Sequence, residues 1–179
     1  MIKLRNYLEK THPIKIILHL TTIFLIIYLI GVLWVFFIGE PIESLELGQD
    51  KKVTEIFLHN LNVSLLILLI GSITGGCYSV IIIFLNGYIL GKLLQYLTIH
   101  KMLYTVPPGL LPHAIIEIFT LCIFSAISML PILMLYYFLT SPKQIPRNII
   151  YFCLKALICA IFMLLIAALL ECHASKIPV

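Results

Sequence analysis

The stretch IFLHNLNVSLLILLIGSITGGCYSVIIIFLNGYILGKLLQYL, from Ile56 to Leu97, is almost unbroken apolar sequence. A transmembrane α-helix needs about 20 apolar residues, so this run is too long for one span and long enough for two short ones. Gly75-Gly76 stands near its middle and predicts the break between two helices. The stretch therefore predicts two membrane spans, or one span followed by a re-entrant segment.

The composition of the whole chain agrees with a protein solvated by lipid. Of its 179 residues, 61% are hydrophobic and only 11% are charged, whereas soluble domains carry roughly 25% charged residues. The apolar runs leave no room for a soluble domain, so residues 1–179 are predicted to form a single transmembrane bundle. The net charge of +4 comes without a basic groove interleaved with aromatic residues, which argues against a nucleic-acid partner.

Three further apolar runs complete the predicted fold. Ile16–Ile38 is longer than the core of a signal peptide and lacks a cleavage site after it, so we expect a retained helix. Pro112 suits the first turn of a helix that extends to about Leu139, and a last helix covers Ile149–Leu170. The expected fold is thus an all-α integral membrane protein of about five transmembrane helices.

Basic residues orient the bundle, because cytoplasmic ends of transmembrane helices are enriched in lysine and arginine. Four such residues precede the first helix, and two more lie in the 141–148 loop: Lys3, Arg5, Lys10, Lys15, Lys143 and Arg147. The N-terminus is therefore expected in the cytoplasm, with the acidic 39–55 loop and the C-terminus outside. Lys92 and Lys101 run against this orientation.

Four glycines of the long apolar stretch have the spacing of close helix packing. Gly71 and Gly75 form one GxxxG spacing, and Gly87 and Gly91 form another. Small residues at this spacing let helix backbones approach each other in lipid. We expect these glycines to pack the second and third helices against one another.

Acidic residues are rare after Glu55, and both that remain lie in or beside apolar helices. Glu117 follows His113 by four residues, so the two share one face at the start of the fourth helix. Glu171 and His173 stand at the end of the fifth helix. Ionisable groups inside a membrane are energetically unfavourable, and function is their default explanation.

The predicted topology places these groups in the outer leaflet with the start of the second helix, which carries His59, Asn60 and Asn62. A polar pocket between three helices is the resulting hypothesis. His113, Glu117 and Glu171 are its candidate catalytic residues. Candidate pocket-lining residues are His59, Asn60, Asn62, Asn86 and His173.

Several chemical interpretations of this pocket stay open. An interhelical hydrogen-bond network that only fixes packing is one. His113 could act as a general acid or base. Zinc is a third, with His113, Glu117, Glu171 and His173 as ligands, although no HExxH motif is present. No decisive nucleophile is visible, and Asn60 could simply cap its helix.

The order of these features resembles the stage II sporulation protein M family (DUF95-like), over about residues 57–179. The matching features are amides opening a helix, spaced glycines, Asn-Gly, Pro-His-x-x-x-Glu, and a last helix ending in Glu. They fall on Asn60, Gly71, Gly75, Asn86-Gly87, Gly91, Pro112-His113, Glu117 and Glu171. Ala114 and Leu61 depart from the family pattern.

The resemblance implies a multi-pass protein of a bacterial cell membrane and offers two precedents. One is a scaffold for cell-wall-remodelling enzymes during sporulation; the other is a small member associated with circular bacteriocin biosynthesis. His113 with Glu117 and the short loops favour the second.

The function hypothesis is therefore maturation of a hydrophobic, circular bacteriocin-like peptide by leader removal, cyclisation or export, with a peptidase or cyclase role at the pocket. The alternative is a non-catalytic scaffold or immunity-type protein, and a small transporter ranks last. Expected partners are the lipid bilayer, the precursor peptide, membrane proteins of the same operon, and a second copy of the chain.

Overall fold

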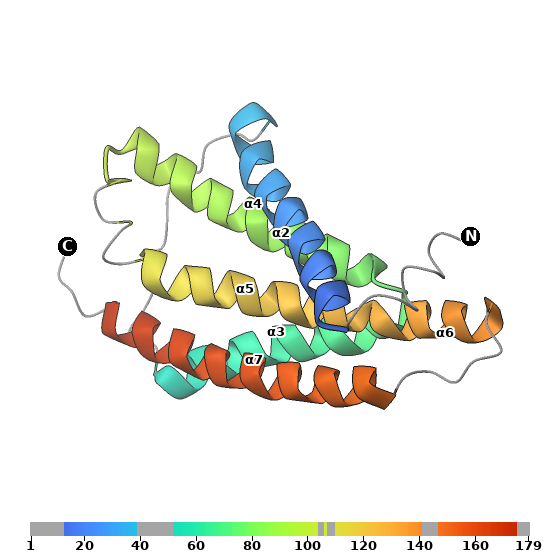
Figure 1. The fold of residues 1–179 in the computed structure, drawn as a ribbon. Helices are drawn as coiled ribbons and strands as arrows, with labels where there is room; N and C mark the ends of the chain where they lie inside the picture. Colours follow the sequence, from blue (N-terminus) through green and yellow to red (C-terminus); the bar gives the residue numbers. More distant parts are fainter. Residues whose placement is uncertain (1–12, 39–51, 104–105, 107–109, 141–146, 175–179) are drawn as a thin grey trace.

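The computed structural model describes residues 13–38, 52–103, 106, 110–140 and 147–174 (Figure 1). Five helical segments in this part are long and apolar enough to cross a membrane, and it contains no strand. The expected all-α fold with five candidate spans is confirmed. The helices are α2 (Pro13–Ile38), α3 (Val53–Ile73), α4 (Cys77–Ile99), α5 (Leu111–Ser128), α6 (Leu130–Thr140) and α7 (Arg147–Ala174).

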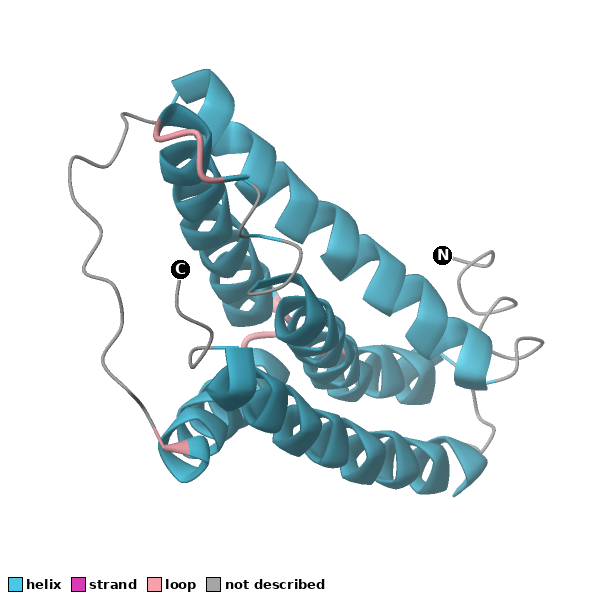
Figure 2. Cartoon of the chain, turned by 90° about the vertical axis from the view of Figure 1, so that its left-hand side faces the viewer, coloured by secondary structure: helices cyan, strands magenta, loops and turns pink. Residues whose placement is uncertain are grey.

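The helices form two groups that α5 joins. Helix α2 packs along α4, while α3, α5 and α7 pack on one another, and α5 also contacts α2 and α4. Figure 1 shows both groups, and Figure 2 views them from the end at which α5 begins. In the most apolar part of the span formed by α5 and α6, 50% of the residues are buried, whereas this share does not exceed 28% in any other span. Helix α5 is therefore the centre of the bundle.

The break predicted at Gly75-Gly76 is confirmed. Helix α3 ends at Ile73 and α4 begins at Cys77. The φ angles of Gly75 and Gly76 are +62° and +93°, a left-handed region that only glycine enters at little energetic cost. The turn gives two separate helices, each long enough to span a membrane.

The glycines of α4 pack against a different helix from the one expected. A Cβ atom on Gly87 would collide with the backbone carbonyl of Tyr28, and one on Gly91 with that of Val32. Both carbonyls belong to α2. The expectation that these glycines pack the second and third helices together is thus wrong, because GxxxG indicates a close approach without identifying the neighbour.

Gly71 lies where three helices meet. A Cβ atom there would contact the hydroxyls of Ser79 in α4 and Ser128 in α5. These two fully buried hydroxyls are 2.7 Å apart and share a hydrogen bond, and Ser128 also donates to the carbonyl of Ser125 at 2.7 Å. Such polar contacts between membrane helices stabilise a particular packing, and the absent side chain of Gly71 makes room for this one.

The expected fourth helix is continuous from Pro112 to Leu139, whereas the structure divides it at Met129. Pro131 explains the break, because proline has no N–H to donate and its ring clashes with the carbonyl four residues earlier, here that of Ile127. Helix α6 begins at Leu130, directly after this break.

The orientation in the membrane stays a prediction that labelling can test. Gln49, Lys143 and Lys176 lie outside the described residues, and each can be replaced by cysteine in a cysteine-free background. We expect Gln49→Cys and Lys176→Cys to react with an impermeant maleimide added to intact cells, because the 39–55 loop and the C-terminus are predicted to be external. Lys143→Cys should react only after permeabilisation. Labelling of Gln49→Cys and Lys176→Cys from opposite sides would reject the topology.

Candidate functional site

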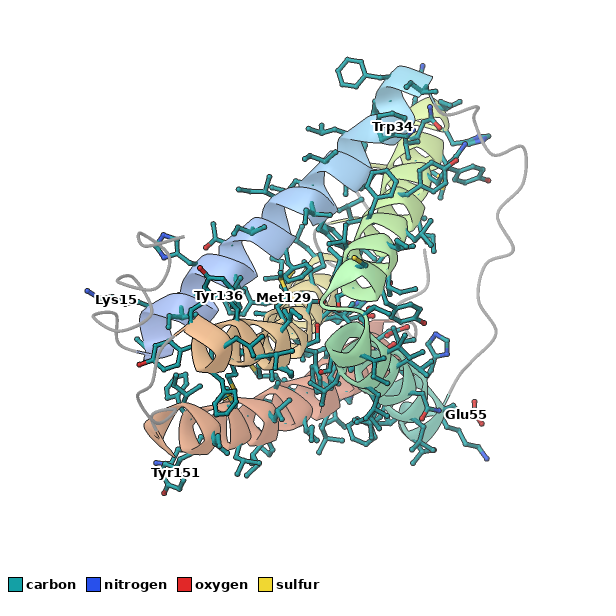
Figure 3. The ribbon with its side chains drawn as sticks, turned by 90° about the vertical axis from the view of Figure 1, so that its right-hand side faces the viewer. Lys15, Trp34, Glu55, Met129, Tyr136 and Tyr151 are labelled. Atoms are coloured by element: carbon teal, nitrogen blue, oxygen red, sulfur yellow. The ribbon has the colours of Figure 1, made fainter. Side chains whose placement is uncertain are left out.

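The start of α3, the start of α5 and the end of α7 lie at the same end of the bundle (Figure 1). A pocket of about 480 Å³ opens between them. Figure 3 labels Glu55, which marks this end of α3. The residues that line the pocket are Glu55, Ile56, His59, Asn60, Leu110, His113, Glu117 and Glu171. Helices that are far apart in the sequence therefore bring polar groups together at one end of the bundle, as the alternating direction of the predicted spans implies.

Helix α5 contributes His113 and Glu117. The helix begins at Leu111, and Pro112 occupies its first turn as expected. The four-residue spacing places both side chains on one face, one turn apart. His113 is 9% exposed and Glu117 is half-buried, so both face the protein rather than lipid.

Helix α7 contributes Glu171, which is half-buried and lines the pocket. Glu117 lines the same pocket from α5, which packs on α7. Two acidic groups that share a pocket away from water favour a cation or a proton between them.

Helix α3 contributes two pairs of lining residues at four-residue spacing. Glu55 precedes His59, and Ile56 precedes Asn60. Glu55 also accepts a hydrogen bond from the backbone N–H of Lys52 at 3.4 Å, which helps to cap the helix. The sequence interpretation places Glu55 in the external loop and so misses it, although its spacing from His59 is the signal that could have found it.

Three of the predicted pocket residues do not line the pocket. Asn62 is exposed, and so is His173, whose Nδ1 lies 3.3 Å from the carbonyl of Leu169. Each stands two residues beyond a lining residue, and two residues rotate a helix by about 200°. Asn86 lies in α4, where its amide donates to the carbonyl of Ile82 at 2.8 Å. Nearness in sequence is a poor guide to a shared helix face.

The predicted zinc ligands are not assembled. Within the described ranges, no three His, Cys, Asp or Glu side chains gather closely enough to hold a metal ion. His173 is outside the pocket that holds His113, Glu117 and Glu171. The geometry gives no support for metal chemistry at this site.

The lining residues offer acid–base groups and hydrogen-bond acceptors. No Ser, Thr, Cys or Lys stands among the described residues of the pocket wall, and Cys172 does not reach it. A histidine beside carboxylates can accept a proton from an attacking group and return it to a leaving group. The described lining thus offers imidazole and carboxyl groups as its reactive side chains.

Residues 20–176 match the family model described as Stage II sporulation protein M. Neither the curated proteins nor the solved structures contain a match. The matched span includes every described pocket-lining residue and reaches into all five apolar helices.

Proposed function

This chain belongs to the stage II sporulation protein M family, and from that premise we propose that it is a membrane-embedded maturation factor for a hydrophobic peptide. The observation that carries the proposal is the pocket in which His113 and Glu117 of α5 meet Glu171 of α7. The five apolar helices agree with a multi-pass membrane protein, and a bacterial cell membrane is the proposed location.

Exposed apolar residues near the lining positions in sequence support a hydrophobic substrate. Leu58 of α3, Ile115 of α5 and Leu170 of α7 are large apolar residues with 54%, 56% and 37% of their surface exposed. In a bilayer such side chains contact lipid tails. A hydrophobic peptide dissolved in the same bilayer can therefore approach the pocket laterally, without crossing a polar surface.

Peptide-bond chemistry needs proton transfers that this pocket can supply. Histidine is a common general acid or base at neutral pH, and Glu117 and Glu171 line the same pocket as His113 and can orient its ring. Leader removal would use water as the attacking group, and head-to-tail joining would use the amine of the peptide itself. Export requires neither step.

Cross-linking tests whether a precursor peptide reaches the pocket. A photoreactive amino acid at Leu110, which lines the pocket, should capture a hydrophobic precursor co-expressed with the protein, because the peptide must lie within contact distance to be processed. The same group at Ile73, 86% exposed at the other end of α3, should not. Mass spectrometry of the adduct and of the released peptide reads out both binding and maturation.

Two results would contradict the proposal. Equal capture at both positions would indicate non-specific lipid-phase encounters. Processing of the precursor in cells that lack this protein, at an unchanged rate, would leave a scaffold or immunity-type role as the better description.

A further inference from the structure

The charge of the pocket wall is one-sided. Three carboxylates line it, one from each of α3, α5 and α7, and the described lining residues contain no lysine or arginine. Building on the proposed function, we propose that this pocket binds a primary ammonium group, such as the free N-terminus or a lysine side chain of the hydrophobic peptide. The charge of the pocket selects the ammonium group, and the bilayer accommodates the apolar remainder of the peptide.

No lysine or arginine in the part of the chain that the structure describes pairs with these carboxylates, and the basic groups beside them in the pocket are the imidazoles of His59 and His113. Glu55 accepts a hydrogen bond from a backbone N–H, and neither Glu117 nor Glu171 forms an ion pair with a described lysine or arginine. Glu117 and Glu171 are half-buried, whereas Glu55 is exposed, and charged groups removed from water are normally paired. A ligand cation supplies the missing charge.

Asn60 gives a second, independent argument for the same ligand. Its residue surface is only 8% exposed, and it lines the pocket. Its backbone carbonyl accepts a hydrogen bond from Ser64 at 2.8 Å, but its side-chain amide has no hydrogen-bond partner among the described residues. The amide is not one of the fully buried polar groups that lack a partner, so it is reachable from the pocket. The amide oxygen of Asn60 is thus available to a donor that enters the pocket.

The number of acceptors suits an ammonium group. An ammonium has three N–H donors and no acceptor, and the pocket presents acceptors from three helices. Hydrogen bonds from a charged donor to carboxylates are about twice as strong as neutral ones. A phosphate or a peptide C-terminal carboxylate would instead be repelled by Glu55, Glu117 and Glu171.

Binding to a synthetic peptide tests the proposal. The probe is a fluorescent leucine–alanine peptide with a free N-terminus, added to the purified protein in phosphatidylcholine nanodiscs. We expect N-acetylation to weaken binding by about tenfold or more, the effect of losing one charge-assisted contact. Glu171→Gln and Asn60→Ala should each reduce this preference, and Asn62→Ala, an exposed position on α3, should keep it. Thermal melting of each variant reports its folding.

Further binding experiments identify which molecule supplies the ammonium group. An acetylated peptide with one lysine that regains the affinity assigns the site to lysine. Phosphatidylethanolamine in the nanodisc that competes with the free peptide shows that a lipid headgroup satisfies the same chemistry. Equal affinity of wild type for free and acetylated peptides, or binding of neither, overturns the ammonium proposal. Because the acetylation comparison uses wild-type protein, and because maturation is measured separately by precursor processing, its failure is distinct from failure of the proposed function.

Discussion

Glu117→Gln and His113→Ala should each lower the yield of mature peptide by about a hundredfold or more, while membrane insertion and thermal stability stay close to wild type. Proton transfer by a positioned side chain contributes about 10²–10⁴-fold to a rate. His113 and Glu117 occupy one face of α5 and open into the pocket, so either substitution removes an acid–base group without deleting a large apolar contact. The measurements are mass spectrometry of the mature peptide and melting in detergent, on the same variants.

The contrast between yield and stability decides between two roles for the pocket. If His113 and Glu117 only hold helices together, both quantities should fall in parallel, since polar contacts between membrane helices contribute to packing. Asn62→Ala is the matched control, because Asn62 is polar, lies on α3 and is exposed outside the pocket. Stable variants that still mature the peptide at the full rate would exclude the functional site and favour a scaffold.

The sequence was sufficient to predict the convergence of α3, α5 and α7, for a simple physical reason. Five apolar spans must alternate in direction, so the start of α3, the start of α5 and the end of α7 belong at one membrane face. Spacing then placed His113 and Glu117 on a shared helix face. The rotation of each helix about its own axis is harder to predict from the sequence, because packing against the neighbouring helices sets it. The prediction that Asn62 and His173 line the pocket fails for that reason, since both are exposed.

Contacts between helices were less predictable than the helices themselves. Gly75-Gly76 marks the break between α3 and α4 because left-handed backbone angles favour glycine. Gly87 and Gly91 indicate that another helix approaches closely, but their spacing does not identify that helix. In the structure it is α2. Pro131 was visible in the sequence, and its interruption of the α5–α6 span follows from the missing N–H.

Gly87→Leu should destabilise the protein more than any single change in the pocket. The Cβ of any residue at this position would overlap the carbonyl oxygen of Tyr28, and a backbone carbonyl cannot swing aside as a side chain can. Helix α2 would have to move away from α4. Overpacking costs typically about 1–3 kcal/mol, and we expect the upper end. For a chain of this size, that corresponds to a drop in Tm of roughly 6–12 °C, measurable by detergent melting.

Ile89→Leu is the matched control for this change, because it places leucine on the same helix, two residues away, at a position 66% exposed. Its melting should equal that of wild type. Gly31→Leu approaches the same contact from α2, where an added Cβ would meet the carbonyl of Phe84, and should reproduce the loss. If Gly87→Leu and Gly31→Leu both melt like wild type, α2 and α4 do not pack through these glycines. The α2–α4 packing described above would then be incorrect, whereas a loss confined to these two variants ties it to the approach of the two backbones.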